Sequence, residues 1–234
     1  MAHGAVASTG LDSELVDAIL RDPQSAPIDE SLRATLRMLE ELTLRPEAFG
    51  PATLSAMSAT GLAPDAIEDA IAVCAHFTYT IRVADCLGFE RPRGLSTWLS
   101  TKYLTGAGYA PEAFDRSGPQ RTAAGWDAIV HDVQNAPGES DPAWRTPILD
   151  WVREDARTAH ADDSAIPADL RTLVRRAARE AYRVDDAMID ELRAAGHTER
   201  LLFEVIALVA IGAGEARYRI GSEALSDVNS AQSL

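Results

Sequence analysis

The sequence predicts an all-α fold, and three observations carry this prediction. Alanine and the aliphatic residues dominate the hydrophobic 46% of the 234 residues, whereas aromatic residues make up 6%. Apolar residues recur at spacings of three and four over long stretches, which is the periodicity of one helix face. Pro64 and Pro92 lie outside the longest of these stretches, as expected because a helix interior does not tolerate proline.

The chain is organised around a helix that we predict over residues 66–90. Asp65 is the expected N-cap of this helix, and Gly88 is its expected C-terminal stop. A helix that is apolar around most of its circumference belongs at the centre of a bundle. The predicted apolar stripe consists of Ile67, Ile71, Cys74, Ile81 and Ala84, widened by Val73, Phe77 and Leu87.

Further helices are predicted from the same periodicity, separated by proline, glycine or polar turns. Asp29 is the expected N-cap of the helix that ends at Arg45-Pro46, and Gly61 forms a tight turn before the central helix. The polar tail, residues 226–234, is expected to fray. In chain order, the predicted ranges are 11–20, 30–44, 51–59, 96–104, 121–134, 143–159, 166–180, 185–195 and 199–223.

The formal net charge of −14 limits the partners that we expect. Nucleic-acid affinity rests on Lys and Arg neutralising phosphates, and anionic membrane surfaces attract basic segments. The most apolar run, residues 201–214, contains Glu204 and is too short to span a bilayer. We therefore expect a small-molecule substrate, and neither nucleic acid nor a membrane as a partner.

The cysteines and the start of the chain favour a cytoplasmic protein. Cys74 and Cys86 lie 12 residues apart on one predicted helix. Their Cα atoms are then about 18 Å apart, which is beyond disulfide reach. Residues 1–10 have the composition of a flexible start and not of a signal peptide. No Cys/His spacing typical of zinc is present, and we expect neither a metal nor a cofactor.

The sequence contains an internal relation at a spacing of 135 residues. This offset lays LSAMSATGLAPDAIEDAIAVCAHFTYTIR over IDELRAAGHTERLLFEVIALVAIGAGEAR. Gly61 then falls on Gly196 and Arg82 on Arg217. We interpret the chain as a tandem duplication of a helical unit. The predicted segments are an N-terminal segment (1–25), a first repeat (26–104), an irregular helical connector (105–165) and a second, diverged repeat (166–234).

The two copies differ where the central helix is polar. Cys74 falls on Val209, His76 on Ile211, Tyr79 on Gly214 and Asp85 on Ile220. Buried polar and ionisable groups are unfavourable unless they are paired, so these residues need a structural or a chemical reason. A polar site on the central helix would therefore belong to the first copy alone.

Residues 26–90 resemble the carboxymuconolactone decarboxylase and alkylhydroperoxidase D-like superfamily, whose members are also described as peroxidase-related. The resemblance rests on APIDESLRATLRMLEELTLRPEAF, the Gly61 turn and AIEDAIAVCAHFTYTIRVADCLGFE. It implies antiparallel helical hairpins that assemble into homo-oligomers (dimers, trimers or hexamers), with pockets between helices. The residues that match the long helix of the family are Phe77, Arg82, Ala84, Asp85, Leu87 and Gly88.

The sequence departs from the redox motif of this superfamily. Its redox members use Cys-x-x-Cys followed by a histidine. Cys74 matches the first cysteine, and His76 matches a histidine that some members have between the two. Phe77 stands in place of the second cysteine and Ile81 in place of the distal histidine. A dithiol cycle needs an attacking thiolate and a resolving thiol within reach, so we do not expect the standard peroxidase mechanism.

The candidate catalytic residues are Cys74, His76 and Tyr79. Cys74 either packs as a small hydrophobe or acts as an activated thiolate. It lies about 200° around the helix from His76, which argues against a Cys–His dyad. Asp69, His76 and Tyr79 share a face and could support general acid–base chemistry. The alternative is a buried histidine that is hydrogen-bonded for structural reasons.

The candidate substrate-binding residues are Arg82, Asp85, Phe77 and Trp98. Arg82 and Asp85 are three residues apart and could form an intrahelical ion pair, which we expect to be buried. Because Arg217 repeats Arg82, an arginine that bridges the repeats is the preferred structural interpretation. The functional alternative is a clamp for an anionic substrate. Trp98 follows the central helix closely and could form the wall of a pocket.

Three hypotheses of function follow. The first is a lyase- or isomerase-like enzyme of the superfamily that lacks the dithiol motif. It would decarboxylate, isomerise or cyclise a small organic acid or ketone, with His76 or Tyr79 as acid or base and Arg82 as anion anchor. The second is a peroxidase-related oxidoreductase that uses Cys74 with an external thiol. The third is a non-catalytic ligand-binding or scaffold protein.

Overall fold

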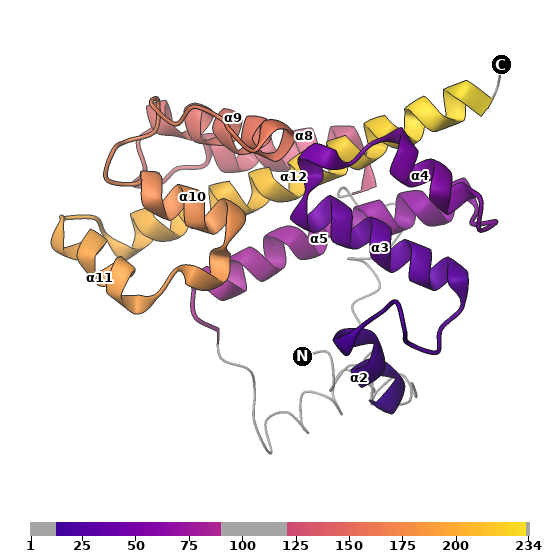
Figure 1. Ribbon diagram of the computed structural model, residues 1–234. Helices are drawn as coiled ribbons and strands as arrows, with labels where there is room; N and C mark the ends of the chain where they lie inside the picture. Colours follow the sequence, from indigo (N-terminus) through magenta and orange to yellow (C-terminus); the bar gives the residue numbers. More distant parts are fainter. Residues whose placement is uncertain (1–12, 90–120, 233–234) are drawn as a thin grey trace, which may run out of the picture.

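The computed structural model describes residues 13–89 and 121–232, and their regular structure is entirely helical (Figure 1). The prediction of an all-α fold is therefore confirmed for these ranges. Trp98 and the helix predicted at 96–104 lie outside them. The elements are α2 (Ser13–Arg21), α3 (Glu30–Leu44), η1 (Pro46–Ala48), α4 (Pro51–Ser58), α5 (Pro64–Cys86), α8 (Ala123–Asn135), α9 (Pro142–Thr158), α10 (Arg171–Arg179), η3 (Ala181–Arg183), α11 (Asp186–Ala194) and α12 (Glu199–Gln232).

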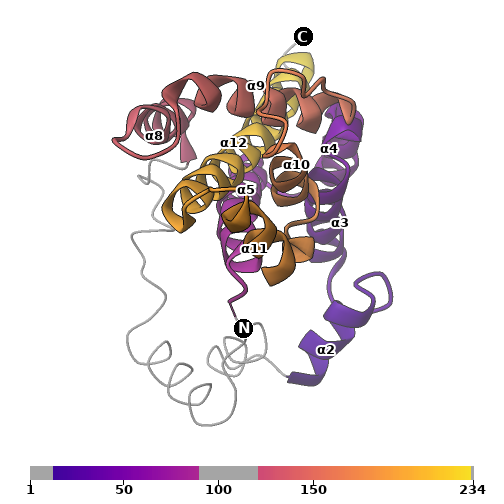
Figure 2. The same cartoon turned by 90° about the vertical axis from the view of Figure 1, so that its left-hand side faces the viewer.

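The centre of the molecule is the pair formed by α5 and α12, which lie side by side in both views (Figures 1 and 2). Figure 2 shows α8 on one side of this pair and α3 and α4 on the opposite side. One hydrophobic cluster is built mainly from α9 to α12, and a second joins α3, α4 and α5 to the later turns of α12. The helix α12 therefore belongs to both clusters and connects them.

Several element boundaries recur at a spacing of 135 residues. The helix α3 ends at Leu44 and α10 ends at Arg179, while α5 begins at Pro64 and α12 begins at Glu199. The 3-10 helices η1 and η3 stand at the same offset. The residues that end α3 and α10 adopt nearly the same backbone angles, with φ and ψ of −140° and 56° at Arg45 and of −141° and 54° at Glu180.

The ends of α5 differ in part from the prediction. Ala63 is the N-cap, Pro64 occupies the first turn, and Asp65 makes no capping hydrogen bond as an N-cap. Proline suits this position because its missing N–H would have no helical partner there. The predicted stop is confirmed: Gly88 has a φ of +62°, and the amide of Phe89 donates to the carbonyl of Ala84 at 2.9 Å. This is the Schellman arrangement, and it ends the helix earlier than predicted.

The predicted apolar stripe of α5 is buried over its first half and exposed over its second. Ile67, Ile71 and Cys74 are buried, but Ile81 is 52% exposed and Phe77 is 36% exposed. The prediction is therefore wrong for Ile81, Phe77 and Leu87. Periodicity marks the face of a helix that can be buried, but it does not show whether a neighbour covers every turn of that face.

The C-terminal tail is helical and not frayed as predicted, because α12 continues to Gln232. Leu225 and Val228 lie three residues apart on this extension, and both are buried in the second hydrophobic cluster. Their contacts explain why the last turns remain helical despite their polar composition. Within the ranges described, no helix has the length and apolar character needed to cross a membrane.

Candidate functional site

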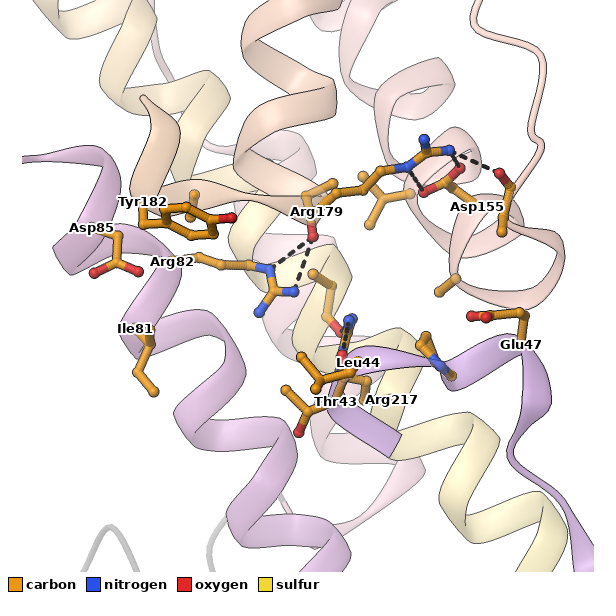
Figure 3. A pocket seen from close by; sticks show the side chains of 17 residues that line it. Thr43, Leu44, Glu47, Ile81, Arg82, Asp85, Asp155, Arg179, Tyr182 and Arg217 are labelled. Carbon is orange, nitrogen blue, oxygen red and sulfur yellow. Dashed lines mark hydrogen bonds and ion pairs between the residues drawn. The ribbon is translucent and has the colours of Figure 1, made fainter. Parts of the chain in front are cut away.

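A cavity of about 440 Å³ lies between α5, α12, the C-terminal end of α3 and the α10–η3 segment (Figure 3). Several of its lining residues form pairs at the 135-residue spacing: Thr43 with Ala178, Pro46 with Ala181, and Arg82 with Arg217. The cavity thus lies where the two related segments of the chain face each other. Its charged lining residues are Glu47, Arg82, Asp85, Asp155, Arg179 and Arg217.

Arg82 crosses from α5 to α10. Its guanidinium donates from Nε and Nη2 to the carbonyl of Ala178, at 3.1 and 2.9 Å, and from Nη1 to the carbonyl of Thr78 at 3.2 Å. The residue is 9% exposed. Figure 3 shows the bonds to the main chain beside Arg179 as dashed lines. Arg82 therefore connects the first half of the chain to the second.

Arg217 makes the reciprocal connection from α12 to α3. Its Nη2 donates to the carbonyl of Thr43 at 2.8 Å, and its Nη1 donates to the carbonyl of Ala213 at 3.1 Å. Thr43 and Ala213 stand 135 residues from Ala178 and Thr78, so both arginines bind equivalent carbonyls. Arg217 is 6% exposed, and its buried Nε–H has no hydrogen-bond partner.

Neither arginine has a carboxylate partner among the described residues, although a buried cation usually has one. Burial is the main cause that lowers the pKa of Arg82, followed by the positive charge of Arg217, while Cys74, Cys86 and Asp85 act in the opposite sense. Burial likewise lowers the pKa of Arg217. Both guanidinium groups still carry their charge at neutral pH. The inner part of the cavity therefore holds two positive charges that lack a counterion in contact.

The carboxylates of the cavity do not fill this role. Asp155 is buried, but Arg179 binds both of its oxygens, with 2.8 Å between Nε and Oδ2. Glu47 and Asp85 are exposed. The predicted ion pair between Arg82 and Asp85 does not form, and only its arginine is buried. The reason is that the Arg82 side chain extends toward α10, where the carbonyl of Ala178 accepts two of its hydrogen bonds.

Cys74 lies behind the cavity wall. Its Sγ atom is 3.3 Å from Oγ1 of Thr43, which lines the cavity, and the residue is 8% exposed. Cys86 is also buried, and burial together with the charge of Asp85 raises the pKa of its thiol to about 11. Both cysteines are free, as their spacing predicts. Cys86 is therefore a protonated thiol at neutral pH.

His76 and Tyr79 are placed away from this cavity. Their rings are 4.9 Å apart, and the ring of Tyr79 is 6.5 Å from that of Trp126 in α8. Neither residue lines the cavity. Burial lowers the pKa of His76, and Asp69 forms an ion pair with Arg121. The structure therefore does not bring the predicted acid or base into contact with the predicted anion anchor.

The remaining candidates divide in the same way. Phe77 contacts the ring of His76, with 6.0 Å between centroids, and Trp98 lies outside the described residues. Arg82 and Asp85 line the cavity. Sequence reasoning noted Arg217 as the repeat of Arg82 but did not place it in the site, and it missed Glu47 and Tyr182. The 135-residue spacing was the signal that could have identified Arg217.

In the part of the chain that the structure describes, no group of three His, Cys, Asp or Glu side chains is arranged to hold a metal ion. Comparisons of the chain with models of protein families, with curated proteins and with solved structures find no match.

Proposed function

We propose that the cavity binds a small organic acid and that Arg82 and Arg217 hold its carboxylate. One observation carries the proposal: two buried guanidinium groups line one cavity, and neither has a carboxylate in contact. Taking charges out of water is unfavourable by several kcal/mol per ion unless a counterion compensates. A bound anion would supply this compensation.

The free hydrogen-bonding capacity of the two arginines supports the same ligand. A guanidinium carries five N–H donors. The bonds of Arg82 to Ala178 and Thr78 use three of them, and those of Arg217 to Thr43 and Ala213 use two. The backbone bonds hold both side chains in place, while the remaining donors are available. Planar guanidinium donors match the geometry of a carboxylate.

We also propose that the protein acts on this acid as a member of the carboxymuconolactone decarboxylase-like superfamily. The resemblance of residues 26–90 supports this family, and the recurrence of helix ends and arginine contacts at 135 residues supports the tandem duplication. The chemistry would be proton transfer in a decarboxylation, isomerisation or cyclisation. Homo-oligomers, which the resemblance implies, are part of the same proposal.

The cavity offers its own candidates for the proton transfer. The carboxylate of Asp85 and the phenol of Tyr182 both line it, whereas His76 and Tyr79 do not. Asp85 could take a proton from the carbon next to the bound carboxylate, and the two arginines would stabilise the negative charge that develops on the ligand. Loss of turnover in Asp85→Asn, with acid binding retained, would support this role over one for His76.

The binding proposal is tested by titration calorimetry of carboxylic acids with the wild type and with Arg217→Met. We expect at least tenfold weaker binding in the variant, because one of the two cations is removed. Arg200→Met, which removes an exposed arginine outside the cavity, is the matched control and should bind as the wild type does. Unchanged affinity in Arg217→Met would contradict the proposal, provided circular dichroism shows that the variant is folded. An absence of binding to the wild type would leave the scaffold hypothesis.

A second candidate function is thiol peroxidase activity with an external thiol. It is favoured by the position of Cys74 behind Thr43 and by its electrostatic interaction with both arginines. The Cys74 thiolate would attack a peroxide oxygen and break the O–O bond, giving a sulfenic acid and releasing the other oxygen as water or an alcohol. One external thiol would displace water from the sulfenic acid, and a second would release Cys74 as a thiol with an external disulfide as product.

Peroxide consumption with dithiothreitol distinguishes this candidate. We would compare the wild type with Cys74→Ser, and use Cys86→Ser as the control because that thiol is also buried on α5. Activity that is lost in Cys74→Ser and retained in Cys86→Ser would support thiol chemistry. Equal rates in all three proteins would rule it out.

A further inference from the structure

We propose that the acid bound in this cavity carries an apolar chain or ring, which leaves the cavity between Leu44, Ile81 and Tyr182. This inference rests on the anion site proposed above and names the class of ligand that fits it. It concerns the part of the cavity that faces solvent, whereas the anion site concerns the buried part.

Three large apolar or aromatic side chains line the mouth of the cavity and remain exposed. Leu44 is 68% exposed, Ile81 is 52% exposed and Tyr182 is 69% exposed. They come from three different elements, α3, α5 and η3. Figure 3 shows them around the guanidinium of Arg82. Single exposed apolar residues are common, but three of them around one opening with buried cations behind it are not explained by chance exposure.

The walls behind the mouth are apolar as well. Val152, Ala156, Ala178, Ala181 and Ala213 line the cavity between the arginines and the surface. A short acid such as acetate would occupy the guanidinium groups and leave these surfaces in contact with water. An acid with a longer apolar part would remove them from water, which is favourable in proportion to the area buried.

The shape of the site favours a ligand over a second copy of the chain. The three residues border a cavity of about 440 Å³, a volume within the range of small-molecule sites, and do not form a continuous flat face. The carboxylates of Glu47 and Asp85 line the same cavity. They would repel a second anionic group, so a single carboxylate at one end and an apolar body at the other fit the arrangement best.

The test is a series of straight-chain carboxylates (acetate, butanoate, hexanoate and octanoate) titrated calorimetrically at constant ionic strength. We expect the dissociation constant to fall about two- to fourfold for each added methylene. In Ile81→Ser this dependence on chain length should become weaker. Leu87→Ser is the matched control, since Leu87 is also exposed near the end of α5 but does not line the cavity. 1-Octanol, which lacks the charge, should bind at least tenfold more weakly than octanoate.

The outcomes separate this inference from the proposal on which it rests. Equal affinities for acetate and octanoate in the wild type would overturn the apolar ligand and leave the anion site standing. Failure of every carboxylate to bind would overturn both. A chain-length effect that persists unchanged in Ile81→Ser would overturn the assigned mouth. A concentration-dependent dimer that Ile81→Ser abolishes, without any chain-length effect in the wild type, would assign the three residues to subunit contact instead.

Discussion

At the scale of single residues, charged groups are held by main-chain atoms as often as by other charges. Arg82 and Arg217 bind carbonyls, and Glu204 accepts hydrogen bonds from the amides of Glu139 and Ser140 at 2.8–3.1 Å. Burial would raise the pKa of Glu204, but these bonds outweigh it and lower the pKa to about 2. Glu204 thereby fixes the turn between α8 and α9.

Glu204 gives a prediction about acid stability. Its folded-state pKa of about 2 lies below the ordinary value of 4.5. The stabilisation is therefore complete above about pH 4.5 and is lost as the pH falls toward 2. The shift corresponds to roughly 3 kcal/mol. Glu204→Gln should unfold at lower urea than the wild type at pH 7, and the difference should shrink toward pH 2.

The matched control for this prediction is Glu191→Gln, which neutralises an exposed carboxylate on α11. It should follow the wild type at both pH values. A stability difference between Glu204→Gln and the wild type that stays constant from pH 7 to pH 2 would contradict the assigned pKa.

At the scale of elements, the close contact of α5 and α12 depends on glycine. A Cβ atom at Gly214 would lie 2.8 Å from the carbonyl oxygen of Ala75 and 3.0 Å from the ring of Trp126. The repeat relation places Gly214 opposite Tyr79 in the alignment, so a small residue occurs in α12 where α5 has a large one. The two central helices can approach each other because of this difference.

We predict that Gly214→Ala destabilises the protein by about 1–3 kcal/mol in urea unfolding, because the backbone of α5 must move to accept the methyl group. This loss should exceed the gain of about 1 kcal/mol in helix propensity. Gly212→Ala is the comparison. Its Cβ would meet the side chains of Leu149 and Val152 at 3.0 and 3.3 Å, and side chains can adjust. A smaller loss for Gly214→Ala than for Gly212→Ala would contradict this account of the contact.

Periodicity and capping predicted the elements better than the site. The Asp29 cap is confirmed by its hydrogen bond from the amide of Leu32, and the Gly88 stop is confirmed by its positive φ. Both depend on local chemistry that the sequence states directly. The cavity depends on η1 and η3, whose three-residue helices carry no periodic signal. The direction of Arg82 depends on a carbonyl 96 residues away, which no local pattern encodes.

At the scale of the whole molecule, two related segments meet at one cavity, and each contributes one arginine. The reciprocal contacts, Arg82 with Ala178 and Arg217 with Thr43, join the halves on either side of this cavity. The polar residues His76 and Tyr79, which are absent from the second half, lie elsewhere. The asymmetry on which the sequence-based hypothesis relied therefore does not coincide with the cavity, whereas the symmetry does.

The central claim is that both halves bind the same anion, and a double-mutant cycle tests it most directly. Octanoate would be titrated calorimetrically into the wild type, Arg82→Met, Arg217→Met and the double variant. We predict one anion per chain and a coupling of about 0.5–3 kcal/mol between the two substitutions, since residues that share a partner are not additive. Additive losses, or two independent anions per chain, would show that the arginines do not act on a common ligand.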